Sequence, residues 1–186
     1  MPQSLRWERE YLPQDWIYEG DNTTRFVLGT KGENPLVCFG INPSTASPKR
    51  SDQTLIRVEK HAYRYGSDID SWIMLNIYPQ RATNPNDLHR ECCPALKAEN
   101  ERRIAALIDG RALTLWAAWG GLISKRPYLL PLVQSIVALP ALQNCTWVSR
   151  GKPTKDGHPH HPLYVKNETP FAPFDISLYN LNTDSP

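Results

Sequence analysis

Apolar residues along the chain gather in short continuous runs that alternate with amphipathic segments, and this alternation predicts the main elements. Apolar runs of strand length cover residues 35–41, 71–77, 112–119 and 145–148. Continuous runs of this kind are typical of central strands that are covered on both faces. Between the runs, apolar residues at helical spacing predict helices over about residues 52–65, 95–108 and 128–138.

The order strand, loop, helix occurs three times, which favours a parallel sheet with helices on both faces, because parallel neighbours need a crossover. Ahead of it, residues 16–18 and 25–28 read as an antiparallel hairpin joined through Gly20-Asp21-Asn22. After Pro170 the chain shows little periodicity, and we expect only its end to be mobile. The predicted fold is α/β: a three-layer α/β/α sandwich around a short, mainly parallel four-stranded sheet, with an N-terminal β-hairpin.

Composition limits the number of domains and the classes of partner that fit this fold. The 186 residues fit one domain spanning 1–186, with a core at about 25–166. The formal net charge of +2 permits contact with a nucleic acid without arguing for it. Six Trp and eight Tyr suit stacking on bases, or equally the packing of a core. The four Cys lack disulfide or zinc spacing, and no apolar stretch nears the ~18 residues of a membrane span. We therefore expect a monomeric, cytoplasmic protein that does not contact a membrane.

Polar residues mark the ends of two apolar runs. Asn42 follows the first run and Asn76 falls at the end of the second. Side chains at the carboxyl ends of neighbouring parallel strands form a pocket. A third polar cluster, His158-Pro159-His160-His161, packs three His into four positions after the last run. The pattern predicts a small-molecule or base-binding site with a possible acid–base group.

Five motifs together resemble the family catalogued as DUF1643. They are Asn42-Pro-Ser-Thr-Ala, Asp52-Gln-Thr, Asn76-x-Tyr-x-x-Arg-Ala-Thr-x-Pro, Trp119-Gly and Gly157-x-Pro-x-His-Pro-Leu-Tyr. The match covers roughly residues 25–166. The family name carries no established activity.

The order of four shorter fragments is also similar to the uracil-DNA glycosylase superfamily. The fragments are Gly40-Ile-Asn-Pro, Met74-Leu-Asn, Trp119-Gly and His161-Pro-Leu. The resemblance implies an α/β/α sandwich around a short parallel sheet. It also implies a pocket for a base that is flipped out of the nucleic-acid stack.

The resemblance assigns a role to each polar strand end. Asn76 would read the base edge through its carboxamide, although it could instead cap the strand. Asn42 would position the attacking water, although Asn-Pro also opens turns. His161 is the preferred donor to the leaving base anion, and His158 and His160 compete for that role. The three His lie too close together to ligate one metal ion, so we expect no metal and no cofactor.

Further residues would complete the site. Ser44 would shape the base pocket, where the superfamily has Gly or Tyr, while Tyr78 and Trp119 would contact the base. Leu163 would wedge into the gap left by the flipped base, or simply start a strand. Basic residues on the same loops could hold phosphates or be merely solvated: Lys49, Arg50, Arg81, Arg150, Lys152 and Lys155.

These expectations favour an N-glycosylase that acts on an unusual, modified or damaged base in DNA. Two alternatives stay open. One is a nucleic-acid or nucleotide binding module without cleavage, and the other is a hydrolase or modifier of free nucleosides or nucleotides. The expected partner is DNA, single-stranded and modified DNA included, or a nucleotide.

Overall fold

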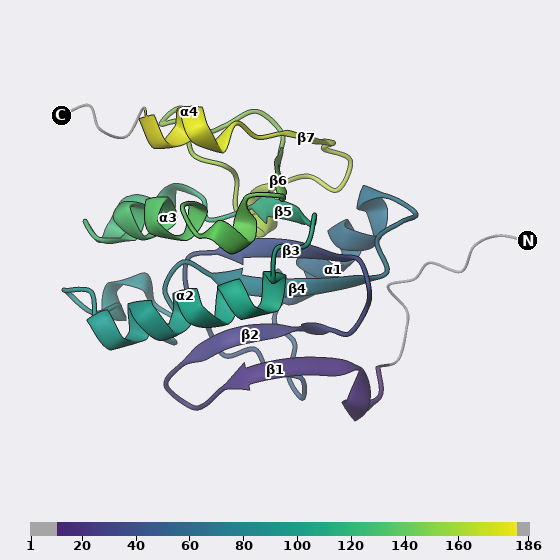
Figure 1. The fold of residues 1–186 in the computed structure, drawn as a ribbon, viewed down its shortest axis with the longest axis horizontal. Helices are drawn as coiled ribbons and strands as arrows, with labels where there is room; N and C mark the ends of the chain where they lie inside the picture. The colour runs from purple at the N-terminus through teal and green to yellow at the C-terminus, as the bar shows by residue number, and fades with distance from the viewer. Residues whose placement is uncertain (1–10, 182–186) are drawn as a thin grey trace, which may run out of the picture.

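The computed structural model describes residues 11–181 and contains one seven-stranded sheet (Figure 1). Its strand order is β1-β2-β4-β3-β5-β6-β7. The strands are β1 (Trp16–Gly20), β2 (Arg25–Thr30), β3 (Pro35–Gly40), β4 (Ser71–Asn76), β5 (Thr114–Ala117), β6 (Thr146–Arg150) and β7 (Phe171–Pro173). The α-helices are α1 (Gln53–Tyr65), α2 (Pro94–Ile108), α3 (Leu129–Val137) and α4 (Ile176–Leu181), and short 3-10 turns include η4 (Gly121–Lys125) and η6 (Pro162–Tyr164).

The sheet is mixed, which confirms the α/β class but corrects the prediction of four strands. The four predicted apolar runs form a parallel centre, in which β4, β3, β5 and β6 are neighbours. Antiparallel strands extend this centre at both sides: β2 pairs with β4, and β7 pairs with β6. The N-terminal hairpin was predicted, but its pairing with the central sheet was not. Local spacing identifies a hairpin without saying which strand it adds to.

Helices cover both faces of the sheet. On one face α2 and α3 pack on a large cluster that includes Phe39, Leu75 and Leu115. On the other face α1 packs on a smaller cluster that includes Cys38, Trp72 and Trp116. Figure 1 shows α2 and α3 in front of the sheet and α1 behind it. The side chains of successive strand residues alternate between these two layers.

The start of α1 is fixed by Asp52, whose side chain accepts the Leu55 N–H at 2.9 Å. This is ordinary N-capping, and it places an acidic side chain beside the loop that follows β3. The predicted helix of residues 95–108 is α2, which has Pro94 at its first turn.

The C-terminal part differs from the expectation of little regular structure. β7 is a three-residue edge strand, and α4 adds a short helix beside it. Elements this short leave no measurable period in a sequence, and Pro173 is tolerated because β7 lies at the sheet edge. The predicted mobile end of the tail falls among residues 182–186, outside the described part of the chain.

No helix within residues 11–181 is long and apolar enough to cross a membrane.

Candidate functional site

A small polar pocket lies at the carboxyl ends of β3 and β4, where the parallel register sets Gly40 beside Asn76. Its volume is about 130 Å³. Four segments meet there: the loop after β3, the start of α1, the loop after β4 and the His-rich loop. The lining includes Arg25, Gly40, Ile41, Asn42, Ser44, Asp52, Thr54, Met74, Ala82, Thr83 and His161.

The amide of Asn42 is held in one orientation. Its Nδ2 donates to the carbonyl of Ala82 at 2.8 Å and to that of Pro43 at 3.0 Å. Both amide hydrogens are thereby used, and the Oδ1 of Asn42 accepts no hydrogen bond from the described residues. The pocket therefore contains a fixed acceptor, which suits a bound water or a donor group of a ligand.

His161 supplies the opposite polarity. Its Nδ1 accepts the N–H of Leu163 at 3.3 Å, which leaves the proton of the neutral ring on Nε2. Burial lowers the pKa of His161, and the negative charge of Asp52 opposes that shift. Around neutral pH the ring is thus an uncharged donor.

Gly120 allows the His-rich loop to approach the end of β5. Its φ is +66°, in the left-handed region, and a Cβ there would lie 3.1 Å from the Cβ of His161. A side chain at this position would be strained and would press on the loop. The Trp-Gly motif is therefore explained by the close approach of His161.

Asn76 lies at the edge of the pocket rather than in its lining. Its side chain is fully buried on the α1 face, and neither Oδ1 nor Nδ2 has a hydrogen-bond partner. Its Oδ1 is 3.3 Å from the place where a Cβ on Gly40 would be, next to the terminal methyl of Met74. An unsatisfied buried amide costs about 1–3 kcal/mol, so its presence here calls for an explanation.

Two charged residues that line the pocket, Arg25 and Asp52, were not assigned to it from the sequence. Arg25 is almost fully buried; its Nη1 donates to the carbonyl of Ala46 at 3.1 Å, and its Nε has no partner. Burial, with a contribution from Arg81, lowers the pKa of Arg25 to about 10, so the group remains a cation at neutral pH. Asp52 was read as a helix start and as part of a family motif, with no role in the pocket. Its place in a family motif was the available signal.

A second hollow of about 480 Å³ adjoins the pocket and shares Ser44, Ala82 and Thr83 with it. Its lining is polar and includes Arg50 and Arg81. The Arg81 guanidinium is committed to the fold, since it donates to the carbonyls of Asp21 and Ala46 and to the hydroxyl of Tyr18. Arg50 is exposed and is the more available cation of the two.

Several predicted site residues lie away from the pocket. Trp119 is fully buried in the α2/α3 core, so the structure does not bring its ring to a bound base. Tyr78 is also buried on that side, where its hydroxyl contacts Nδ1 of His89 at 2.8 Å. The spacing placed both aromatics near a strand end but could not say which face they occupy.

His158 takes a structural position. It is buried, its Nδ1 contacts the hydroxyl of Tyr179 at 3.0 Å, and its Nε2 lies 3.4 Å from the hydroxyl of Ser124. Trp119 Nε1 donates to the same Tyr179 hydroxyl at 3.0 Å. Of the three His, the structure brings His161 to the pocket and uses His158 to fasten the loop to α4 and η4.

Arg150 does not face solvent as a phosphate ligand would. It is buried, contacts Nδ1 of His61, and donates to the carbonyls of Asn167 and Thr169. Its role is to hold the segment before β7 in place. The remaining predicted contacts are exposed outside the pocket: Lys49, Lys152, Lys155 and Leu163.

Among residues 11–181 no group of three or more His, Cys, Asp or Glu could hold a metal ion. The pocket itself presents the Asn42 acceptor, the His161 donor, the Arg25 cation and the Asp52 carboxylate.

The fold and site thus define an α/β protein with a small polar pocket at the ends of its central parallel strands. A protein-family model described as "Protein of unknown function (DUF1643)" matches residues 25–163. The chain belongs to this family. Comparisons with curated proteins and with solved structures give no significant match.

Proposed function

We propose that the protein binds a nucleobase in the pocket between β3 and β4 and hydrolyses its N-glycosidic bond, the substrate being an unusual or modified base in DNA. One observation carries the proposal: a single pocket contains a fixed acceptor, Asn42 Oδ1, and a neutral ring donor, His161 Nε2–H. The likeness of the motif order to the uracil-DNA glycosylase superfamily supports the same reaction.

In this reaction a water held by Asn42 attacks the sugar carbon. The carbon–nitrogen bond breaks, and its electron pair stays with the base. His161 Nε2–H stabilises the resulting anion, and the proton lost by the water ends on the released base. A preorganised neutral donor suffices, because the requirement is a dipole aimed at the developing charge.

The buried amide of Asn76 supports recognition of a base edge. With one acceptor and two donors, none of them used by the described residues, it offers the pattern that a pyrimidine-like edge needs. Met74 lines the pocket and lies beside the same glycine as Asn76. Because methionine side chains are flexible, a shift of Met74 would open the pocket to the Asn76 amide.

The neighbouring hollow would receive the sugar and phosphate, with Arg50 as the cation. Leu163 is 37% exposed and is placed on the His-rich loop, where a wedge residue would be needed.

A second candidate function is hydrolysis of a free nucleoside or nucleotide. It is favoured by the commitment of Arg81 and Arg150 to backbone carbonyls, which leaves fewer cations for a phosphate backbone. A protein that neutralises few phosphates binds DNA weakly and with a shallow salt dependence.

The test is strand cleavage at abasic sites after incubation with oligonucleotides that carry uracil, hypoxanthine or a hypermodified pyrimidine, both single- and double-stranded. We expect the His161→Ala change to lower the cleavage rate by about 10²–10³-fold, the usual cost of removing one donor to a developing anion, with a smaller effect on binding. The matched control is His160→Ala on the same loop. Equal losses in both variants, or equal losses of binding and cleavage, would contradict the role of His161.

Release of free base from nucleosides, followed by chromatography, separates the second function from the first. Base release from nucleosides but from no oligonucleotide would favour the second. If neither substrate class reacts, the proposal of hydrolysis is wrong.

A further inference from the structure

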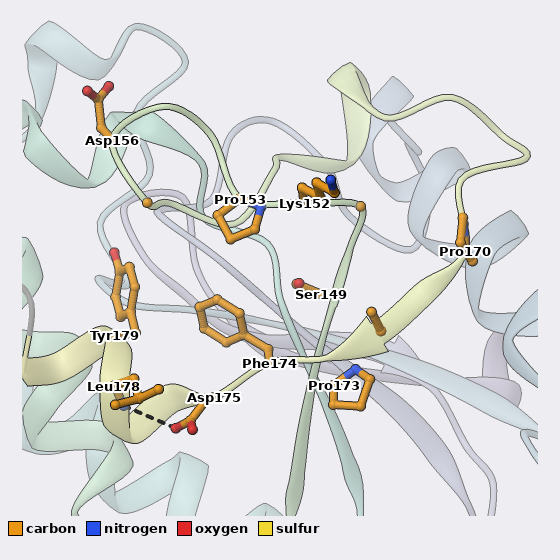
Figure 2. Close-up of a pocket in the computed structure, with 13 residues that line it drawn as sticks. Ser149, Lys152, Pro153, Asp156, Pro170, Pro173, Phe174, Asp175, Leu178 and Tyr179 are labelled. Atoms are coloured by element: carbon orange, nitrogen blue, oxygen red, sulfur yellow. Dashed lines mark hydrogen bonds between the residues drawn. The ribbon is translucent and has the colours of Figure 1, made fainter.

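A second cavity lies at the opposite end of the parallel centre from the hairpin, between β6, β7, α4 and the loop of residues 151–157 (Figure 2). Its volume is about 590 Å³, within the range of small-ligand sites. It shares no lining residue with the candidate site.

The walls of this β6–β7 cavity are flat and apolar. Figure 2 shows the ring of Phe174 in the middle of the close-up, with Pro153 above it, Pro173 beside it and Tyr179 across from it. Phe174 and Tyr179 are braced from behind by Trp119, whose ring centroid is 6.1 Å from the first and 5.6 Å from the second. Rigid aromatic and proline surfaces of this kind favour a planar ring over a flexible chain.

The floor of the cavity carries one hydroxyl that the fold does not use. Ser149 is 3% exposed, lines the cavity, and its hydroxyl has no hydrogen-bond partner among residues 11–181. Its partner across the β6–β7 pair is Ala172, so two small side chains lie side by side and leave the floor hollow. A hydroxyl that faces an apolar cavity is a polar anchor for a ligand.

The rim carries one cation, Lys152, and two carboxylates, Asp156 and Asp175. Asp175 is already satisfied, because it accepts from the N–H groups of Ser177 and Leu178 at 3.1 and 3.0 Å. The hydrogen bond from the Ser177 hydroxyl, and next the Leu178 N–H, lower the pKa of Asp175. The other two charged residues of the rim, Lys152 and Asp156, have charges of opposite sign. A rim of this kind does not select a strongly charged ligand.

We propose that the β6–β7 cavity is a second binding site, for an uncharged planar ring compound of nucleobase or nucleoside size. The ring stacks on Phe174, between it and the prolines, and hydrogen-bonds to the Ser149 hydroxyl. This proposal does not rest on the glycosidic reaction.

The test is calorimetric titration with adenosine, thymidine and their 5′-monophosphates, performed on a variant whose candidate pocket is altered by Asn76→Leu. In this background the second change Ala172→Phe fills the cavity floor. Ala172 is exposed on an edge strand, so folding should survive, as circular dichroism can check. Lys155→Ala is the matched control, since Lys155 is an exposed residue of the adjoining loop that does not line the cavity.

We expect at least one nucleoside to bind with one-site saturation. Ala172→Phe should weaken that binding at least tenfold, whereas Lys155→Ala should leave it unchanged. Undiminished affinity in the Ala172→Phe protein, or no binding by either nucleoside, would overturn the site. Monophosphates that bind tenfold more tightly than their nucleosides would overturn its uncharged character.

Discussion

The two faces of the sheet differ in where they bury polar atoms that have no hydrogen-bond partner. On the α2/α3 face the cluster is mainly aliphatic and aromatic; its Trp119 N–H reaches the Tyr179 hydroxyl, and Asn100 Oδ1 on α2 is buried without a partner. On the α1 face His61 Nε2, Trp116 Nε1 and both polar atoms of Asn76 are buried without a partner. Each such atom costs free energy that apolar packing must offset.

The position of these atoms distinguishes packing from ligand binding. The candidate pocket opens on the α1 side, against Leu55 and Met74, beside the unsatisfied Asn76. A face that serves packing alone would have an apolar residue there. We infer that the α1 face gives up some stability beside the candidate pocket to keep polar groups for a ligand.

The largest expected effect comes from truncating one buried leucine on each face. Leu115→Ala on the α2/α3 side and Leu55→Ala on the α1 side should each lower the free energy of unfolding by about 2–5 kcal/mol, the usual cost of such cavities. Both residues are at most 2% exposed. Only Leu55 lines the candidate pocket, so only Leu55→Ala should also weaken base binding per folded molecule. Denaturant unfolding and titration with free bases provide the two measurements. A comparable loss of affinity in Leu115→Ala would contradict the assignment of the candidate pocket to the α1 face.

A smaller and sharper effect is expected from Asn76→Leu, which keeps the side-chain size and removes the unsatisfied amide. The free energy of unfolding should stay the same or rise by about 1–2 kcal/mol, because no hydrogen bond is lost and a buried polar group is removed. Affinity for a free base should fall at least tenfold. Denaturant unfolding and base titration measure both quantities on the same sample. A clear loss of stability would mean that Asn76 serves the fold and not a ligand.

The sequence predicted the central architecture because its signals are local. Continuous apolar runs identified the four parallel strands, and Asp52, at the start of the helix predicted over residues 52–65, caps α1. β7 and α4 were missed, since three and six residues carry no period. The same logic explains why β5 is shorter than its apolar run: the run also includes buried residues such as Trp119 that follow the strand.

The candidate site was predictable as a location and less so as a set of residues. The ends of the apolar runs predicted Asn42 and Asn76 as site residues. The cluster His158-Pro159-His160-His161 predicted a histidine in the site but not which one faces the pocket. The orientation of Arg150 depends on contacts with His61 and with carbonyls nearly twenty residues away in sequence. Arg25 lines the pocket because its strand, β2, pairs with β4. No local sequence pattern shows that the hairpin joins the sheet at this place.

The most gradual expected effect is the pH dependence that His61 gives to the α1 face. Burial, and next the nearby Arg150 cation, lower the pKa of His61 to about 3, below its ordinary value of 6.5. As the pH falls below 6.5 the unfolded chain takes up this proton first, so stability is full above that pH and declines between 6.5 and about 3. One such group contributes a loss of about 1.4 kcal/mol per pH unit in that window. His61→Gln keeps an acceptor for Arg150 but does not titrate. Urea unfolding at pH 7.5, 6 and 5 should therefore show a shallower decline in this variant, and equal slopes in the two proteins would mean that the ring is charged or solvated in the folded state.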